Sequence, residues 1–175
     1  AAQHTAAILT SFNEVDMSAI MALREKYKDS VLKNKGVKIG MVGVFAMAAV
    51  RALKEYPLVN STFTGEDIIE RDFVDLSIAV STERGLVVPV IRDCDKLDWV
   101  SFEKKLAEIA GKARDGKLSI PEVTGGTFTI TNGGVFGSLV STPLLNMPQS
   151  AILGLHTIKE RPVAVNGKVE IRPMM

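Results

Sequence analysis

The sequence has little of the residues on which most catalytic centres depend. It holds a single cysteine, Cys94, so no internal disulfide can form, which indicates a reducing compartment. Cys94 lies between Asp93 and Asp95, whose charges would raise the pKa of its thiol, and this predicts an unreactive cysteine. The only histidines are His4 and His156, and neither lies beside a plausible nucleophile or in a metal-ligand cluster. A Gly-x-Ser-x-Gly elbow, a Walker loop and zinc-type Cys/His spacing are also missing.

The sequence also has almost no excess of one charge over the other, and it has no long apolar runs. With 21 basic and 20 acidic side chains, the balance of charge points neither to nucleic acid nor to an anionic membrane as a partner. No apolar run reaches the roughly 20 residues of a membrane span, and the first residues do not read as a signal or transit peptide. A chain of 175 residues, 46% hydrophobic, can form one domain with a sizeable core. We expect a soluble intracellular domain whose two ends are cuts rather than natural termini.

The first third of the chain predicts one strand and two helices. Ala6–Met17 alternates like a strand, and Ser18 is placed to cap the helix that follows. This helix ends at Gly36 and carries an apolar stripe expected to face the core. The stripe consists of Ile20, Leu23, Tyr27 and Val31. Met41–Tyr56 is almost free of charge, so this second helix should be buried on nearly all sides until Pro57.

The middle of the chain predicts a pair of strands and a third helix. Phe73–Ser81 alternates in the manner of a strand, and Leu86–Arg92 returns as an apolar run that suits a buried strand. Pro89 interrupts this second run and marks an edge or a bulge, because proline donates no ladder hydrogen bond. Asp98 can cap an amphipathic helix over Trp99–Arg114.

The last segments predict a buried strand and a hairpin. Ser150–His156 is the strand, and a satisfied core or interface histidine is expected at its end more than a general base. Asn166 and Gly167 separate two apolar-rich runs within Val163–Arg172, which is a strong hairpin signal. Strands and helices mix without strict alternation, so the fold class is α+β with a mixed β-sheet.

The stretch Gly125–Pro143 (GGTFTITNGGVFGSLVSTP) is the pattern that most resembles a binding slot. Thr127, Thr129 and Thr131 share one face of a strand and apolar residues the other, as in a strand packed on one side only. After Asn132, glycines allow positive φ and the close approach of a ligand or another backbone. Thr131 is the hydroxyl nearest this loop. The alternative is an ordinary threonine-rich edge strand followed by a turn.

Six segments, in order along the whole chain, resemble the catalytic domain of dihydrolipoamide succinyltransferases, the acyltransferase core component of 2-oxoglutarate dehydrogenase complexes. They are Ser11–Met17 (SFNEVDM), Val80–Arg92 (VSTERGLVVPVIR), Lys112–Leu118 (KARDGKL), Gly125–Leu139 (GGTFTITNGGVFGSL), Gln149–His156 (QSAILGLH) and Arg172–Met175 (RPMM). The resemblance implies that residues 1–175 form an acyltransferase catalytic (core) domain that is incomplete at its C-terminal end. It implies the two-layer fold of chloramphenicol acetyltransferase and the transfer of a succinyl group between dihydrolipoamide and coenzyme A.

The same resemblance assigns roles to four residues. Thr131 matches the oxyanion donor of the family, and Arg24, Ser81 and Asn132 match contacts to coenzyme A (succinyl-coenzyme A). The family's general base is the histidine of a His-x-x-x-Asp-Gly motif, which lies beyond the end of this chain. Two interpretations follow: a fragment of an active enzyme, which we favour, or a non-catalytic core or scaffold subunit without the base. We expect the 175 residues alone to be inactive.

The resemblance also implies partners. Members of the family form homotrimers, eight of which make a 24-subunit cubic cage in the succinyl branch, and the site lies between two subunits. The implied neighbours are the 2-oxoglutarate dehydrogenase and dihydrolipoamide dehydrogenase components, and the lipoyl group is carried on an upstream domain. No nucleic acid, membrane or metal is implied. The implied location is the mitochondrial matrix, or the cytoplasm of a bacterium.

Overall fold

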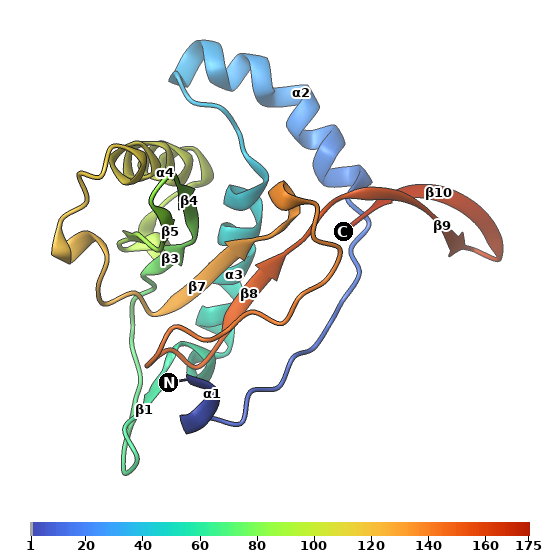
Figure 1. Cartoon of the computed structure of the whole chain (residues 1–175). Helices are drawn as coiled ribbons and strands as arrows, with labels where there is room; N and C mark the ends of the chain where they lie inside the picture. The colour runs from blue at the N-terminus through green and yellow to red at the C-terminus, as the bar shows by residue number, and fades with distance from the viewer. Residues whose placement is uncertain (1) are drawn as a thin grey trace.

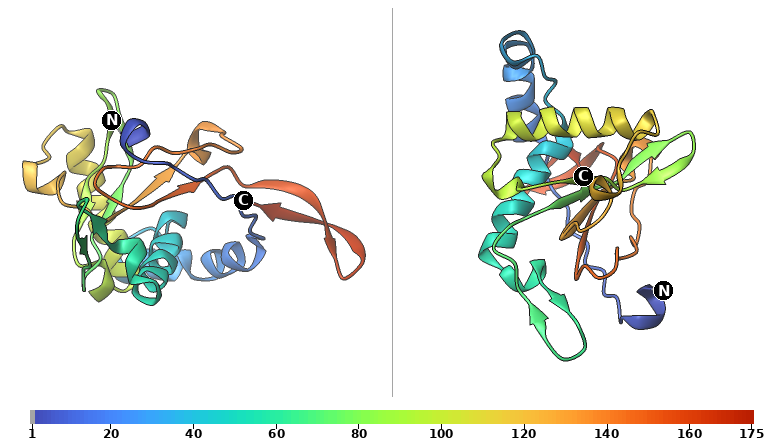
Figure 2. Two further views of the ribbon diagram at one scale, coloured as in Figure 1. Left: turned by 90° about the horizontal axis from the view of Figure 1, so that it is seen from below. Right: turned by 90° about the vertical axis from the view of Figure 1, so that its left-hand side faces the viewer.

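A four-stranded mixed sheet lies at the centre of the computed structural model, which describes residues 2–175 (Figure 1). In sheet order the strands are β6 (Val90–Ile91), β3 (Leu76–Ile78), β7 (Phe128–Asn132) and β8 (Ile152–Leu155). β3, β7 and β8 run parallel, and β6 is antiparallel to β3. Helices α3 (Met41–Glu55) and α4 (Trp99–Arg114) cover one face of this sheet (Figure 2). The predicted α+β fold with two layers and a mixed sheet is confirmed.

The remaining elements surround this sheet. They are α1 (Ala2–Thr5), α2 (Ser18–Lys35), β1 (Thr62–Phe63), β2 (Ile68–Ile69), β4 (Val80–Thr82), β5 (Gly85–Val87), β9 (Lys159–Val165) and β10 (Lys168–Met174), with 3₁₀ turns at Pro57–Asn60, Cys94–Lys96, Ile120–Glu122 and Gly134–Phe136. The pairs β1-β2, β4-β5 and β9-β10 form separate antiparallel ribbons. Helix α2 and the β9–β10 hairpin reach away from the central sheet, and we call these two elements the arms (Figure 1).

The core lies between the sheet and its two helices. Phe102 of α4, Leu76 of β3 and Ile130 of β7 are all at most 1% exposed. Helix α3 contributes its small and apolar side chains along one face, while Ala48 and Arg51 remain exposed. The expected burial of this helix on nearly all sides is therefore only partly confirmed.

Local signals in the sequence predicted α4 and the hairpin correctly. The Asp98 carboxylate accepts a 2.6 Å hydrogen bond from the Ser101 amide, which is the expected cap of α4. Asn166 and Gly167 have φ angles of 50° and 78°, as a type I′ hairpin turn requires. Gly36 ends α2 in the left-handed region, at φ 69°.

Before α3, the predicted helix that ends at Gly36 is confirmed as α2, but three other predictions were wrong. Ala6–Met17 is not a strand: only Asp16 forms an isolated bridge, with Met174. Ser18 is the first residue of α2 rather than its cap, and its amide donates to the Asp16 carboxylate at 2.9 Å. The apolar stripe of α2 is not in the core, since no residue of this helix is buried. Its apolar periodicity is real, but in the described part of the chain the stripe is at most half-buried, as at Ile20 and Val31.

The two predicted middle strands are each divided. Phe73–Ser81 contains β3 and β4, and Leu86–Arg92 contains β5 and β6, with Pro89 in the break. Pro89 has no amide proton to donate, although its carbonyl accepts from the Ile78 amide at 2.9 Å. As expected of a strand beside proline, β6 lies at the sheet edge.

Strand β7 differs from both interpretations of its threonine pattern. It lies between β3 and β8, so it is not an edge strand. It is also packed on both faces, because Thr127 and Thr129 are as buried as Phe128 and Ile130. The threonine face is covered by the segment that carries Gln149. The Gln149 side chain accepts a hydrogen bond from the Thr129 hydroxyl.

Candidate active site

Of the three threonines on one face of the Gly125–Pro143 stretch, Thr127 and Thr129 use their hydroxyls in structural hydrogen bonds. The Thr127 hydroxyl accepts from the Asp75 amide at 3.2 Å. The Thr129 hydroxyl donates to the Gln149 side chain, which also donates to the Gly126 carbonyl at 2.8 Å. A Cβ on Gly126 would lie 1.9 Å from the Ser77 hydroxyl, so only glycine fits there. This polar network fixes β7 against β3 and the 146–150 segment.

Thr131 differs from the other two threonines. It is half-buried, and its hydroxyl has no hydrogen-bond partner among residues 2–175. Next to it, the Asn132 side chain accepts from the Gly134 amide at 2.9 Å, and the Gly133 amide donates to the Leu155 carbonyl at 2.9 Å. A rigid strand therefore ends in a donor that is free to bind something else.

The glycines after Asn132 allow close approach rather than unusual backbone angles. A Cβ on Gly134 would lie 2.4 Å from the His156 carbonyl oxygen, which no side chain tolerates. Gly133 has an ordinary φ of −79°, and of the loop glycines Gly137 takes a positive φ, at 77°. The expected close contact is thus confirmed, and it is made with the backbone that follows β8.

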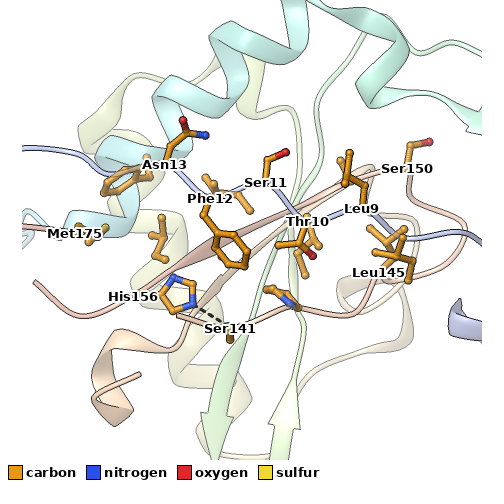
Figure 3. A pocket seen from close by; sticks show the side chains of 18 of the residues that line it. Leu9, Thr10, Ser11, Phe12, Asn13, Ser141, Leu145, Ser150, His156 and Met175 are labelled. Carbon is orange, nitrogen blue, oxygen red and sulfur yellow. Dashed lines mark hydrogen bonds between the residues drawn. The ribbon is translucent and has the colours of Figure 1, made fainter. Parts of the chain in front are cut away.

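A cavity of about 470 Å³ lies beside β8 (Figure 3). Its walls are the extended residues 7–13, strand β8, the 141–145 segment and Met175. Phe12 and His156 both turn toward this space in Figure 3. The His156 Nε2 lies 2.8 Å from the Ser141 hydroxyl. Sequence reasoning had assigned His156 to a core or interface, whereas the structure places it in a cavity wall.

The cavity adjoins Thr131 through Gly154. These two residues are direct partners in the parallel β7–β8 ladder, so their Cα–Cβ directions point to the same face of the sheet. A Cβ on Gly154 would lie 3.4 Å from the His156 Cε1 and 2.9 Å from Pro143. The imidazole therefore lies over Gly154, on the face that carries the Thr131 hydroxyl.

The other predicted contacts lie elsewhere in the chain. Arg24, on α2, donates from Nε to the Ile39 carbonyl at 2.8 Å. Ser81 is exposed on β4. No hydrogen bond joins Arg24 or Ser81 to the end of β7 in the part of the chain that the structure describes. The structure thus places Thr131 beside Asn132, and puts Ser81 just after β3, the parallel neighbour of β7, and Arg24 on α2.

Sequence reasoning missed an ion pair that holds the start of the slot. The buried Asp75 carboxylate contacts the Arg92 guanidinium at 2.7 Å and accepts from the Asp93 amide at 2.8 Å. Arg92 also donates to the carbonyls of Pro121, Thr124 and Gly125. A charged residue in the predicted alternation of Phe73–Ser81 was the only signal for it. The pair fixes the loop that leads into β7.

A second buried carboxylate was also missed. Glu103 is 5% exposed and accepts from the Gly40 amide at 2.8 Å and from the Trp99 indole at 3.2 Å. Burial raises the pKa of Glu103. A carboxylate next to Phe102, on the apolar side of α4, was the available signal. It connects α4 to Gly40, the N-cap residue of α3.

The other groups examined for chemistry, the cysteine and the possible metal ligands, form no reactive site in residues 2–175. Cys94 is buried, and this burial, more than the neighbouring acids, raises the pKa of its thiol to about 12. The raised pKa agrees with the predicted unreactive cysteine, although its main cause is burial. Within residues 2–175, no cluster of three or more His, Cys, Asp or Glu side chains is placed to hold a metal ion. None of the helices described there combines the length and apolar character needed to cross a membrane.

Comparison with known proteins gives one consistent family. The model of the 2-oxoacid dehydrogenases acyltransferase (catalytic domain) matches residues 1–175. The succinyltransferase component of the 2-oxoglutarate dehydrogenase complex of Haemophilus influenzae is 56% identical over 174 residues, which cover 99% of this chain and 42% of that protein. The mitochondrial component of Saccharomyces cerevisiae is 53% identical over 173 residues, 99% of this chain and 37% of its own length. The chain thus spans about two fifths of the length of these relatives.

A solved structure extends the likeness to three dimensions. The cubic core of a pyruvate dehydrogenase multienzyme complex aligns with a TM-score of 0.90 at 36% identity, covering 95% of this chain and 69% of the other. At this level of identity the likeness goes beyond the fold. By sequence and by structure, the chain belongs to the catalytic-domain family of the 2-oxoacid dehydrogenase acyltransferases.

Proposed function

We propose that the chain is the acyltransferase core of a 2-oxoglutarate dehydrogenase complex and transfers a succinyl group between dihydrolipoamide and coenzyme A. The observation that carries the proposal is the unpartnered Thr131 hydroxyl, held at the end of a buried strand whose other hydroxyls are occupied. Such a fixed donor is what a developing oxyanion needs, because it requires no rearrangement when charge appears. Relatives that match 99% of the chain carry the succinyltransferase name.

The reaction assigns one clear task to Thr131. A thiol attacks the thioester carbonyl carbon, a new C–S bond forms, and the carbonyl oxygen becomes negative. The Thr131 hydroxyl donates to this oxygen, and one such donor contributes about 3 kcal/mol to the stability of the transition state. When the carbonyl re-forms, the other C–S bond breaks and the second thiol leaves with the proton.

The attacking thiol needs a base that these residues do not provide. A thiol of pKa about 8.5 is mostly protonated at neutral pH, so its proton must be removed as it attacks. We assign this step to the histidine of the family's His-x-x-x-Asp-Gly motif, outside the 175 residues, and to a neighbouring subunit. Arg24, Ser81 and Asn132 are proposed contacts for coenzyme A. We propose that these contacts belong to a site shared between subunits.

The assembly follows from the same proposal. We propose trimers in a cubic, 24-subunit cage, together with 2-oxoglutarate dehydrogenase and dihydrolipoamide dehydrogenase components and a lipoyl domain upstream. The likeness to a cubic core supports this arrangement. Because relatives include bacterial and mitochondrial proteins, the proposed location is bacterial cytoplasm or mitochondrial matrix.

The test is an acyl-transfer assay on the protein at its full natural length. Succinyl-coenzyme A and dihydrolipoamide are supplied, and formation of the succinyl thioester is followed, with native mass spectrometry of the same sample. We expect transfer by an oligomer built of trimers. A full-length protein that assembles but transfers no acyl group would instead be a scaffold subunit.

A further inference from the structure

We propose that Glu103 positions Arg24 for the binding of coenzyme A, through a single peptide unit that lies between the two side chains. This inference rests on the proposed function, in which Arg24 contacts coenzyme A. The Arg24 Nε donates to the Ile39 carbonyl at 2.8 Å. The next amide, that of Gly40, donates to the Glu103 carboxylate at 2.8 Å. This carbonyl and this amide belong to one planar peptide, so the buried carboxylate on α4 is two hydrogen bonds away from the guanidinium on α2.

The segment between α2 and α3 fixes Arg24 more firmly than its own helix does. No residue of α2 is buried, so side-chain packing within the chain holds this helix only weakly. The segment after Gly36 is different, because Val37 and Ile39 are 6% and 5% exposed. The hydrogen bond to the Ile39 carbonyl therefore connects a largely exposed helix to a buried piece of backbone.

This bond leaves part of the guanidinium available. Arg24 is half-buried, and its two Nη groups have no hydrogen-bond partner among residues 2–175. Coenzyme A carries phosphate groups, and a planar guanidinium binds a phosphate through two parallel hydrogen bonds. Because the group is planar, the position of Nε sets the direction of both Nη groups. A shift of the Ile39 carbonyl would thus redirect the donors that face the ligand.

The carboxylate at the other end is closely confined. Glu103 is 5% exposed and also accepts from the Trp99 indole at 3.2 Å. A Cβ on Gly43 would lie 2.3 Å from the Glu103 Oε1, and a Cβ on Gly40 would lie 3.1 Å from it. Glycine at both positions therefore leaves the room that the carboxylate fills. A buried carboxylate costs free energy that an apolar contact between α3 and α4 would avoid, which points to a further role for a polar group here.

The charge of Glu103 also strengthens the hydrogen bond on the far side of the peptide. Hydrogen bonds in a chain polarise one another, and the effect is larger in surroundings of low dielectric constant. An amide that donates to a carboxylate has a more negative carbonyl oxygen, so Ile39 becomes a better acceptor for Arg24. Burial raises the pKa of Glu103, whereas its hydrogen bonds and the charge of Arg24 act in the opposite direction. The two charges thus interact favourably across the peptide.

The experiment measures turnover and coenzyme A binding in the full-length protein. In Glu103→Leu, which removes the acceptor of the Gly40 amide, we expect KM for succinyl-coenzyme A to rise about 3- to 10-fold, the value of one hydrogen bond. In the same variant, kcat and KM for dihydrolipoamide should stay within about twofold of wild type, because the change acts on one substrate. Glu103→Gln keeps an acceptor, so its KM for succinyl-coenzyme A should stay within about threefold. Calorimetric titration with coenzyme A should rank the affinities in the same order without turnover.

A double-variant cycle separates positioning from a general loss of stability. Arg24→Gln should raise KM for succinyl-coenzyme A about 10- to 100-fold, and adding Glu103→Leu should raise it no further, because no guanidinium is left to position. Glu108→Leu is the matched control, since it makes the same change on the same helix at a carboxylate that is 67% exposed. If Glu103→Leu does not assemble, Glu103→Asp replaces it: the shorter side chain withdraws the acceptor and should raise this KM about threefold.

The outcomes distinguish this inference from the proposed function. Equal changes in kcat and in both KM values would overturn the inference, as would losses from Arg24→Gln and Glu103→Leu that multiply in the double variant. It would also fail if Arg24→Gln weakens coenzyme A binding while the Glu103 variants bind as wild type does. A wild-type protein that transfers no succinyl group, or an Arg24→Gln protein with unchanged affinity, would instead count against the proposed function.

Discussion

The central sheet and the two arms are equally regular in secondary structure but differ in where their apolar side chains lie. In the sheet, Leu76 and Ile130 are completely covered by α3 and α4. In the arms, Tyr27 on α2 is 43% exposed and Val169 on β10 is 77% exposed. The apolar side chains of the sheet are buried by helices of the same chain. The arms, in contrast, leave apolar side chains exposed to solvent.

The difference shows which elements depend on neighbours. Isolated two-stranded hairpins are marginal in water, and helices take most of their stability from a packed apolar face. No residue of α2 is buried, and Met174 is the one buried residue of the β9–β10 hairpin. Figure 1 shows both elements extending away from the central sheet. We therefore expect the arms to pack against other subunits and the sheet to supply the chemistry.

The largest effect is expected when the chain is separated from everything else. The 175 residues contain the proposed oxyanion donor, and neither of their histidines matches the family's base. A general base contributes about 10²- to 10⁴-fold, so the purified 175-residue chain should show negligible succinyl transfer. The measurement is the transfer assay on a purified chain whose mass is verified by mass spectrometry and whose folding is verified by circular dichroism. Robust turnover that His156→Ala abolishes would show that the base lies in the cavity.

A pair of core and arm substitutions tests the comparison directly. Phe102→Ala removes a side chain that is 0% exposed and should lower the free energy of unfolding by about 3–5 kcal/mol. Val169→Ala, on the exposed hairpin, should change it by about 0.5 kcal/mol or less in the dissociated chain. Denaturant unfolding at low protein concentration measures both.

The same pair separates folding from assembly. In the assembled protein, Val169→Ala should weaken association while Phe102→Ala should mainly weaken the fold. Light scattering over a dilution series gives the association. If Val169→Ala costs as much as Phe102→Ala in the dissociated chain, the arm belongs to the core after all.

Local chemistry made some elements predictable from sequence, and long-range packing hid others. The Asp98 cap and the Asn166–Gly167 turn act over three or four residues, so their patterns were sufficient. The stripe on α2 predicted the helix, but it could not show whether this chain buries that face, and no residue of α2 is buried. Residues before Asp16 alternate like a strand, yet alternation does not supply a neighbouring strand to pair with.

In the candidate site too, local features could be predicted from sequence and long-range contacts could not. The Thr131 pattern was visible, because alternation and the glycines after it are local features. The cover on its face was not, since Gln149 approaches from 20 residues away in sequence. The position of His156 over Gly154 depends on the 141–145 segment turning back onto β8. No periodicity in the sequence reports such a turn.

Two hydroxyls on one strand give the next test, in the full-length enzyme. Thr131→Ala should lower kcat by about 10²-fold with KM within a few-fold, because the hydroxyl acts mainly on the transition state. Thr131→Ser keeps the donor and should keep much of the rate. Thr129→Ala is the matched control: it leaves Gln149 without its donor and should cost about 1–3 kcal/mol of stability with kcat little changed. Turnover within about threefold of wild type in Thr131→Ala would make Thr131 an ordinary strand residue.

The smallest effect is expected at Glu103, where α4 meets the N-terminal end of α3. Because burial raises its pKa in the folded state, the folded chain binds this proton more tightly than the unfolded chain, and stability falls as pH rises from the ordinary value of 4.5 through the folded pKa. Glu103→Gln keeps an acceptor for the Gly40 amide and the Trp99 indole but cannot ionise. It should be more stable than wild type at pH 7, and the difference should shrink as the pH falls toward 4.5. Glu103→Leu leaves both donors unpaired and should lose about 1–3 kcal/mol at every pH. Thermal unfolding from pH 4 to 8 measures all three proteins. A Glu103→Gln protein that is less stable than wild type at pH 7 would mean that the ionised carboxylate contributes more through these donors than its burial costs.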